Sequence, residues 1–131
     1  MAKKKTGRIA AAVLIAEDRA EMRIAQMSKG QIAVLDDLVF PVEFREEDLR
    51  REGILPDGIQ QLDEILTGFA QVLEEYDIRE IVARYTRILS AAPNCAYVFG
   101  RLKGRTGLDF RLLTDMDERI LMTWQTMAAL P

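Results

Sequence analysis

The chain has 131 residues, enough for one hydrophobic core but too few for two independent lobes of ~100 residues or more each. Its 18 basic and 21 acidic residues give a formal charge of −3, which provides no overall electrostatic drive toward nucleic acid or a membrane surface. Histidine is absent, and this excludes Ser-His-Asp and Cys-His catalysis as well as histidine-ligated zinc.

The chain begins with a basic segment, residues 1–7, that contains Lys3, Lys4 and Lys5. A short terminal lysine run predicts a disordered solubilising tail, with a hook for polyanions as the alternative. We expect residues 8–131 to form a single domain.

Three strand patterns follow this tail. Residues 8–16 are apolar and predict a buried strand, because the run is about half of what a ~30 Å bilayer core requires of a helix. Residues 22–27 alternate as a second strand after a turn at residues 17–20. Residues 32–44 predict a third, in which Pro41 indicates an edge position or a late break. Consecutive strands of this kind predict an antiparallel meander.

A charged stretch precedes the clearest helix, which begins near Pro56. Apolar residues recur every three or four positions in this helix and predict one buried stripe: Ile59, Leu62, Ile65, Leu66, Phe69, Val72, Leu73 and Tyr76. The acidic residues before the helix could be read as oxygen ligands for a metal: Asp36, Asp37, Glu46, Glu47 and Asp48. Their spacing lacks the pattern and glycine of a calcium loop, which favours solvated faces instead.

The last third alternates strand and helix. Residues 78–85 predict a strand. A helix is expected from Asn94 to Lys103, ending near Gly104 or Gly107, and is followed by a strand over residues 108–114 and a helix over residues 117–129. Cys95 is expected to pack inside its helix. As the single cysteine it excludes an internal disulfide, and with no recognisable secretory leader it predicts a reducing, cytoplasmic location.

The predicted order is β-β-β-α-β-α-β-α, with three antiparallel strands first and parallel strands added later. It matches the half-domain of the ribonuclease H-like superfamily that includes actin and sugar kinases. In such sheets ligands bind at the carboxyl ends of the strands, where Asp115, Asp117 and Glu118 are expected.

The chain also resembles the N-terminal lobe of the exopolyphosphatase and guanosine-pentaphosphate phosphohydrolase (Ppx/GppA) family. The resemblance is distributed over the Pro56 helix, residues 78–83, the Asn94 segment and residues 106–121 (TGLDFRLLTDMDERIL). It implies Mg²⁺-dependent hydrolysis of a terminal phosphoanhydride in polyphosphate or guanosine pentaphosphate, with Glu118 as general base and Asp117 as its acidic neighbour. The alternative is that both acids merely stabilise a helix N-terminus.

The chain departs from this family in its first turn. The family has Asp-x-Gly-Ser-Asn there to hold metal and phosphate, and the matching residues here are Leu14, Ala16, Glu17 and Asp18. A carboxylate and a phosphate charge ~4 Å apart repel by ~4 kcal/mol at an effective dielectric of about 20. The resemblance therefore implies a degenerate phosphate loop.

A second departure lies at residues 85–94, where Ser90 replaces the family's phosphate-binding arginine. Arg84 or Arg87 could substitute as a phosphate-binding residue, or each could be a surface arginine with no role in a site.

The resemblance also implies a second lobe that would begin where this chain ends, so we expect the chain by itself to provide only half of the family's phosphate contacts. We therefore expect the isolated chain to be weakly active or inactive. The alternative is a non-catalytic binding or dimerisation module, which would associate with a second copy or with a protein that supplies the second lobe. Trp124 on the last predicted helix could serve that association or pack on the chain's own sheet. Neither nucleic acid nor membrane is expected as a partner.

Overall fold

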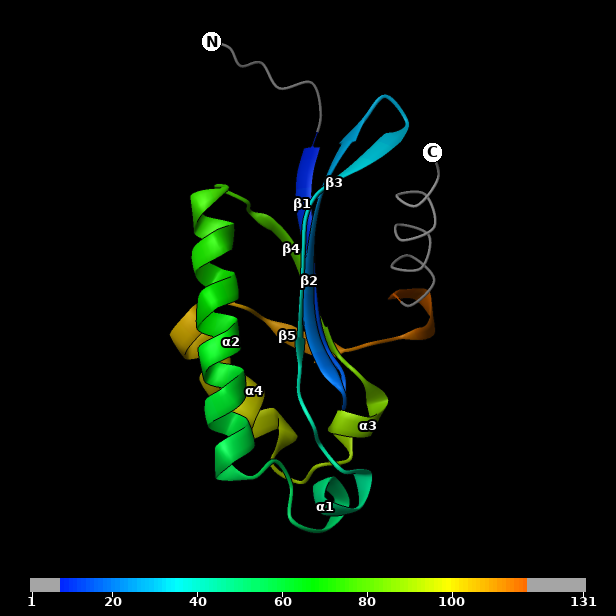
Figure 1. Ribbon diagram of the computed structural model, residues 1–131. Coiled ribbons are helices and arrows are strands. Elements are labelled where there is room, and N and C mark those ends of the chain that lie inside the picture. Colours follow the sequence, from blue (N-terminus) through cyan, green and yellow to red (C-terminus); the bar gives the residue numbers. More distant parts are fainter. Residues whose placement is uncertain (1–7, 118–131) are drawn as a thin grey trace.

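The computed structural model describes residues 8–117, which form a five-stranded sheet with helices α2 and α4 on one side (Figure 1). The strand order is β3-β2-β1-β4-β5. The first three strands are antiparallel, β4 runs parallel to β1, and β5 runs parallel to β4. This is the predicted ribonuclease H-like arrangement. The strand bounds are β1 Arg8–Ile15, β2 Arg19–Ser28, β3 Gln31–Pro41, β4 Glu80–Tyr85 and β5 Phe110–Leu112.

Four helices connect these strands: α1 Glu46–Arg51, α2 Pro56–Glu75, α3 Arg87–Ser90 and α4 Cys95–Thr106. Helix α2 begins at Pro56, as predicted, because a proline in the first turn loses no intrahelical hydrogen bond. Helix α4 ends directly before Gly107, one of the two glycines near which it was predicted to end, and the φ of 79° at this residue suits glycine.

The core lies between the sheet and helices α2 and α4. Helix α2 contributes the predicted stripe through Leu62, Leu66, Phe69 and Leu73, while Tyr76 is 39% exposed and was wrongly placed in it. Tyr76 immediately follows the helix as its C-cap, so its side chain leaves the buried face. Cys95 packs in the core, as predicted, and burial raises the pKa of its thiol. No polar or charged residue in the described range is buried.

The third strand is shorter than predicted. It lies at the sheet edge, as Pro41 indicated, and ends at that residue. The chain then turns its backbone N–H groups toward the β1–β2 turn: Val42 donates to the Asp18 carbonyl at 3.2 Å and Phe44 to the Glu17 carbonyl at 2.9 Å. Residues 42–44 are therefore fixed to the turn without extending the sheet.

Helices α1 and α3 were not predicted. Helix α1 forms within the charged stretch, with acidic residues in its first turn and basic residues in its last, the distribution that the helix dipole favours. Arg50 and Glu46 pair at 2.5 Å along it, and Leu49 is buried beneath it. Helix α3 is a single turn directly after β4. Within residues 8–117, no helix is long and apolar enough to cross a membrane.

The described range leaves some predictions untested. The basic tail of residues 1–7 lies outside it, as do Glu118, Trp124 and nearly all of the helix expected over residues 117–129. Asp115 and Asp117 lie inside it, and both are helical.

Candidate functional site at the carboxyl edge of the sheet

The three parallel strands end together at one edge of the sheet. Leu14 of β1 pairs with Arg84 of β4, which in turn pairs with Arg111 of β5. Just beyond the strands, the Thr86 N–H donates to the Ile15 carbonyl at 3.1 Å. Ligands of open α/β sheets usually bind at the carboxyl ends of the parallel strands, so this edge is the expected position of a functional site.

The β1–β2 turn forms one boundary of the edge. The Ala16 N–H donates to the Arg19 carbonyl at 2.8 Å and closes the turn, and Ala16 itself is buried. Asp18 is exposed and pairs with Arg19 at 2.9 Å, while Glu17 is half-buried and makes no ion pair within the described residues. The turn thus places two carboxylates where the resemblance implies a phosphate loop.

Arg84 and Asp117 meet at the other boundary, although 33 positions separate them in the sequence. The Arg84 Nε lies 2.9 Å from Asp117 Oδ2, and Arg84 Nη1 donates to the Ala83 carbonyl at 2.9 Å. The Thr114 N–H donates to the same Asp117 oxygen at 3.2 Å, and the Asp117 N–H donates to Thr114 Oγ1 at 3.1 Å. The arginine is therefore held in place by the chain's own carboxylate.

These hydrogen bonds set the protonation of Asp117. Partial burial alone would raise the pKa of this carboxyl, but the hydrogen bonds from Arg84 and Thr114 outweigh it and lower the pKa below its usual value. Asp117 is therefore ionised at neutral pH and would not act as a proton donor there.

Arg87 and Ser90 are placed differently. Arg87 is exposed in α3 and makes no ion pair within residues 8–117. The Ser90 hydroxyl donates to the Arg87 carbonyl at 2.6 Å and so closes its own short turn. Of the two arginines that the sequence suggested, only Arg84 is brought into contact with a predicted site residue.

The residues at the edge do not fit a Mg²⁺ site. Leu14 has no ligand oxygen where the resemblance implies a metal carboxylate, and Asp117 is paired with a guanidinium. In the described part of the chain, no group of three or more carboxylate or cysteine side chains is arranged to hold a metal. Two of the acidic residues considered in the sequence are engaged elsewhere: Asp37 pairs with Arg23 at 2.7 Å and Glu46 with Arg50.

Asn94 acts as a clamp, a role that sequence reasoning missed. Its amide accepts a hydrogen bond from the Ile54 N–H at 2.9 Å and donates to the Ile54 carbonyl at 3.0 Å. Gly53 makes room for this side chain, because a Cβ there would lie 2.4 Å from Asn94 Oδ1. This pair of hydrogen bonds joins the start of α4 to a loop 40 residues earlier in the chain, and no local sequence pattern predicts it.

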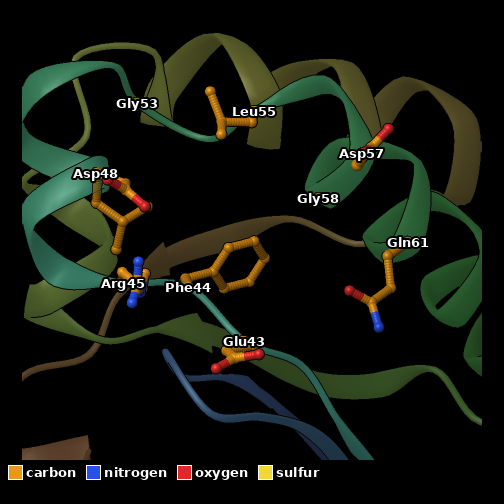
Figure 2. A pocket seen from close by; sticks show the side chains of 10 residues that line it. Glu43, Phe44, Arg45, Asp48, Gly53, Leu55, Asp57, Gly58 and Gln61 are labelled. Carbon is orange, nitrogen blue, oxygen red and sulfur yellow. The ribbon is translucent and has the colours of Figure 1, made fainter.

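A pocket of about 450 Å³ lies beside the β1–β2 turn, between residues 43–45, α1 and the start of α2. Figure 2 shows the Phe44 ring across this pocket, with Leu55 on one side and Glu43 on the other. Asp48 and Asp57 also line it. None of these three carboxylates makes an ion pair within the described residues. The pocket is also lined by one arginine, Arg45, so its three acids and one base leave an excess of negative charge that disfavours phosphate.

Comparison with solved structures finds the same fold in larger proteins. A Ppx/GppA family member from Aquifex aeolicus superposes with a TM-score of 0.77 at 20% identity, over 85% of this chain and 36% of that one. An exopolyphosphatase from Cytophaga hutchinsonii gives 0.70 at 14% identity, over 81% and 34%. An exopolyphosphatase-like protein gives 0.76 at 14% identity, over 89% and 36%. No family model and no curated protein matches the sequence.

The chain spans only about a third of the length of these structures. Identities of this size establish a common fold. The activity of the chain depends on the residues that it places at its own site.

Proposed function

We propose that this chain is a lobe of the exopolyphosphatase and guanosine-pentaphosphate phosphohydrolase type whose phosphate-binding edge is degenerate. By itself it hydrolyses polyphosphate or guanosine pentaphosphate weakly or not at all. The fold shared with Ppx/GppA proteins supports the relationship. The chemistry of the edge supports the loss of activity.

The β1–β2 turn carries this proposal. In the Ppx/GppA pattern the turn offers a metal carboxylate, a glycine, a hydroxyl and an amide, whereas here it offers Leu14, Ala16, Glu17 and Asp18. Two carboxylates oppose a phosphate, and a leucine cannot hold the metal that would offset them. The remaining family residue, Glu118, would have no positioned phosphate to act on.

The test restores the family turn in the chain. Purified wild type and a quadruple variant, Leu14→Asp, Ala16→Gly, Glu17→Ser and Asp18→Asn, are incubated with Mg²⁺ and a polyphosphate ladder or guanosine pentaphosphate while phosphate release is followed. We expect wild type to match the buffer blank and circular dichroism to show that both proteins are folded. Robust Mg²⁺-dependent release by wild type that vanishes in Glu118→Gln would overturn the proposal.

A second candidate function, a binding or dimerisation module, is favoured by the exposed edge strand β3. Val39 is 56% and Phe40 44% exposed on this strand. Sedimentation of the same samples separates the two proposals. A discrete dimer that Val39→Lys converts to a monomer supports the module, whereas a monomer at every concentration with no affinity for the ladder argues against it.

A further inference from the structure

The sheet has a second face, which points away from α2 and α4 (Figure 1). Side chains alternate along a strand, so Val13 and Ile15 of β1 enter the core while Ala10 and Ala12 lie on the second face. The antiparallel register places Ala25 of β2 beside Ala10 on this face. No helix in the described part of the chain runs along the strands there (Figure 1).

The centre of the second face is apolar. Ala10, Ala12 and Ala25 are 3%, 7% and 0% exposed, yet none of them belongs to the core beneath α2 and α4. Strand β1 is the middle strand of the sheet, and its sequence RIAAAVLI is apolar at every position after Arg8. A continuous apolar run of this kind is typical of a strand that is covered on both faces. The second face therefore has the composition of a covered surface.

Charged side chains around these alanines are paired with one another. Arg23, which is opposite Ala12 in the register, lies 2.7 Å from Asp37. At the other end of β1, Arg8 pairs with Glu80. Removing a charge from water costs much less when the charge is already paired. Covering this face with apolar side chains is therefore less costly than covering a face with free charges.

The chain arrives at the second face at the end of the described range. Arg84 is opposite Leu14 in the β1–β4 register and so lies on the second face, as does its partner Asp117. Thr114 and Asp117 exchange two hydrogen bonds, at 3.2 and 3.1 Å, in the reciprocal manner of a capping box that begins a helix. Figure 1 shows this first helical turn on the side of the sheet opposite α2.

Residues 118–131 follow directly and have the sequence pattern of an amphipathic helix. Leu121, Trp124 and Ala128 recur at spacings of three and four, and only the first two residues of the segment are charged. A helix of 14 residues is about 21 Å long, and the 8 residues of β1 span about 26 Å. The segment is therefore long enough to cover most of the strand.

We propose that residues 118–131 form a helix that lies along the second face, with Trp124 packed on Ala10, Ala12 and Ala25. A large ring against small side chains fills the space between a helix and a sheet without leaving a cavity. This assignment goes beyond the proposed function and does not rest on it. It gives the segment to the chain's own sheet, and it leaves the edge strand β3 as the surface for association with a second copy.

Nuclear Overhauser spectra of the full chain test the contact directly. Trp124 is the only tryptophan, so its indole protons are assigned without ambiguity. With alanine methyl groups labelled, we expect cross-peaks from this ring to Ala12 and Ala25 and none to Ala96, which is exposed on α4. The absence of cross-peaks to the alanines of the second face overturns the proposal.

A mixed sample decides which copy provides the helix. One copy carries the labelled alanines, and the other carries the only protonated tryptophan. We expect no cross-peaks in this sample. Cross-peaks that appear only between copies would mean that a second copy covers the face, and they would also overturn the proposal.

A charge placed on the second face gives an independent test. Ala12→Glu should detach the helix and raise acrylamide quenching of Trp124 fluorescence about threefold, because an unpaired carboxylate is costly to bury. Ala96→Glu adds the same charge to the exposed surface of α4 and should leave quenching unchanged. Circular dichroism shows whether both variants are folded. Unchanged quenching in folded Ala12→Glu contradicts the docking, and if this variant does not fold, the cross-peaks of the wild type decide.

Discussion

The helix-covered face of the sheet and its carboxyl edge belong to the same strands but are stabilised by different kinds of contact. The covered face is made of apolar side chains at regular spacings, such as Leu62, Leu66 and Phe69 of α2. The edge is made of charged side chains whose partners come from distant segments, as Arg84 and Asp117 do. No polar side chain is buried on the covered face within the described residues. At the edge, several charged side chains are present, and some of them form ion pairs with one another. Stability should therefore depend on the face and ligand preference on the edge.

The largest effect is expected on the covered face. Phe69 is 1% exposed and lies 5.8 Å from the Phe40 ring between centroids. Phe69→Ala should lower the free energy of unfolding by about 3–5 kcal/mol, because it removes buried apolar surface and leaves a cavity. Urea denaturation measures this, with Thr67→Ala on the exposed side of the same helix as the matched control. A loss below about 1 kcal/mol for Phe69→Ala would mean that the face does not carry the stability assigned to it.

An intermediate effect is expected at the Asn94 clamp, which combines features of both regions. Asn94→Ala should cost about 1–3 kcal/mol, because it leaves the part-buried N–H and carbonyl of Ile54 without their partner. Asn94→Asp keeps an acceptor for the Ile54 N–H but cannot donate to the carbonyl, so it should fall between wild type and alanine. Thermal unfolding of the three proteins ranks them, and equal melting temperatures would contradict the clamp.

The smallest effect on stability is expected at the edge. Asp117→Asn should cost about 0.2–1 kcal/mol at neutral pH, as for a partly exposed ion pair. The folded-state pKa of Asp117 is lowered, so its contribution is complete above the unfolded value of about 3.9 and is lost as pH falls through the lower folded value. The difference between wild type and variant should be flat from pH 8 to 5 and shrink below about pH 4. Urea midpoints across this range check it, and a difference that grows in acid would show the opposite shift.

Sequence reasoning recovered the covered face well. The spacing of Leu62, Leu66, Phe69 and Leu73 indicated a buried stripe, and Pro56 and Pro41 marked where a helix begins and where an edge strand ends. These features are local, because the period of a helix and the missing N–H of proline act within a few residues. The order of three antiparallel strands and later parallel ones followed from the same patterns, and it led to the ribonuclease H-like fold.

The short elements and the edge could not be derived in the same way. Helices α1 and α3 have 6 and 4 residues, too few for their own periodicity to stand out, and α1 depends on the burial of Leu49. Asn94 was noticed as part of a family pattern, but its bond to Ile54 joins segments 40 residues apart. Position Tyr76 fits the apolar spacing and still faces solvent because α2 ends just before it.

By itself the sequence determined the fold class and the chemistry available: no histidine, a leucine and two acids in the first turn, and arginines at the end of the fourth strand. Only the tertiary structure decided which of these groups meet. It placed Arg84 against Asp117 and left Arg87 in solvent, because the parallel register of β1, β4 and β5 sets which side chains reach the common edge. Local sequence patterns determine the secondary structure of each segment. The partner of a charged side chain depends on contacts between segments that are far apart in the sequence.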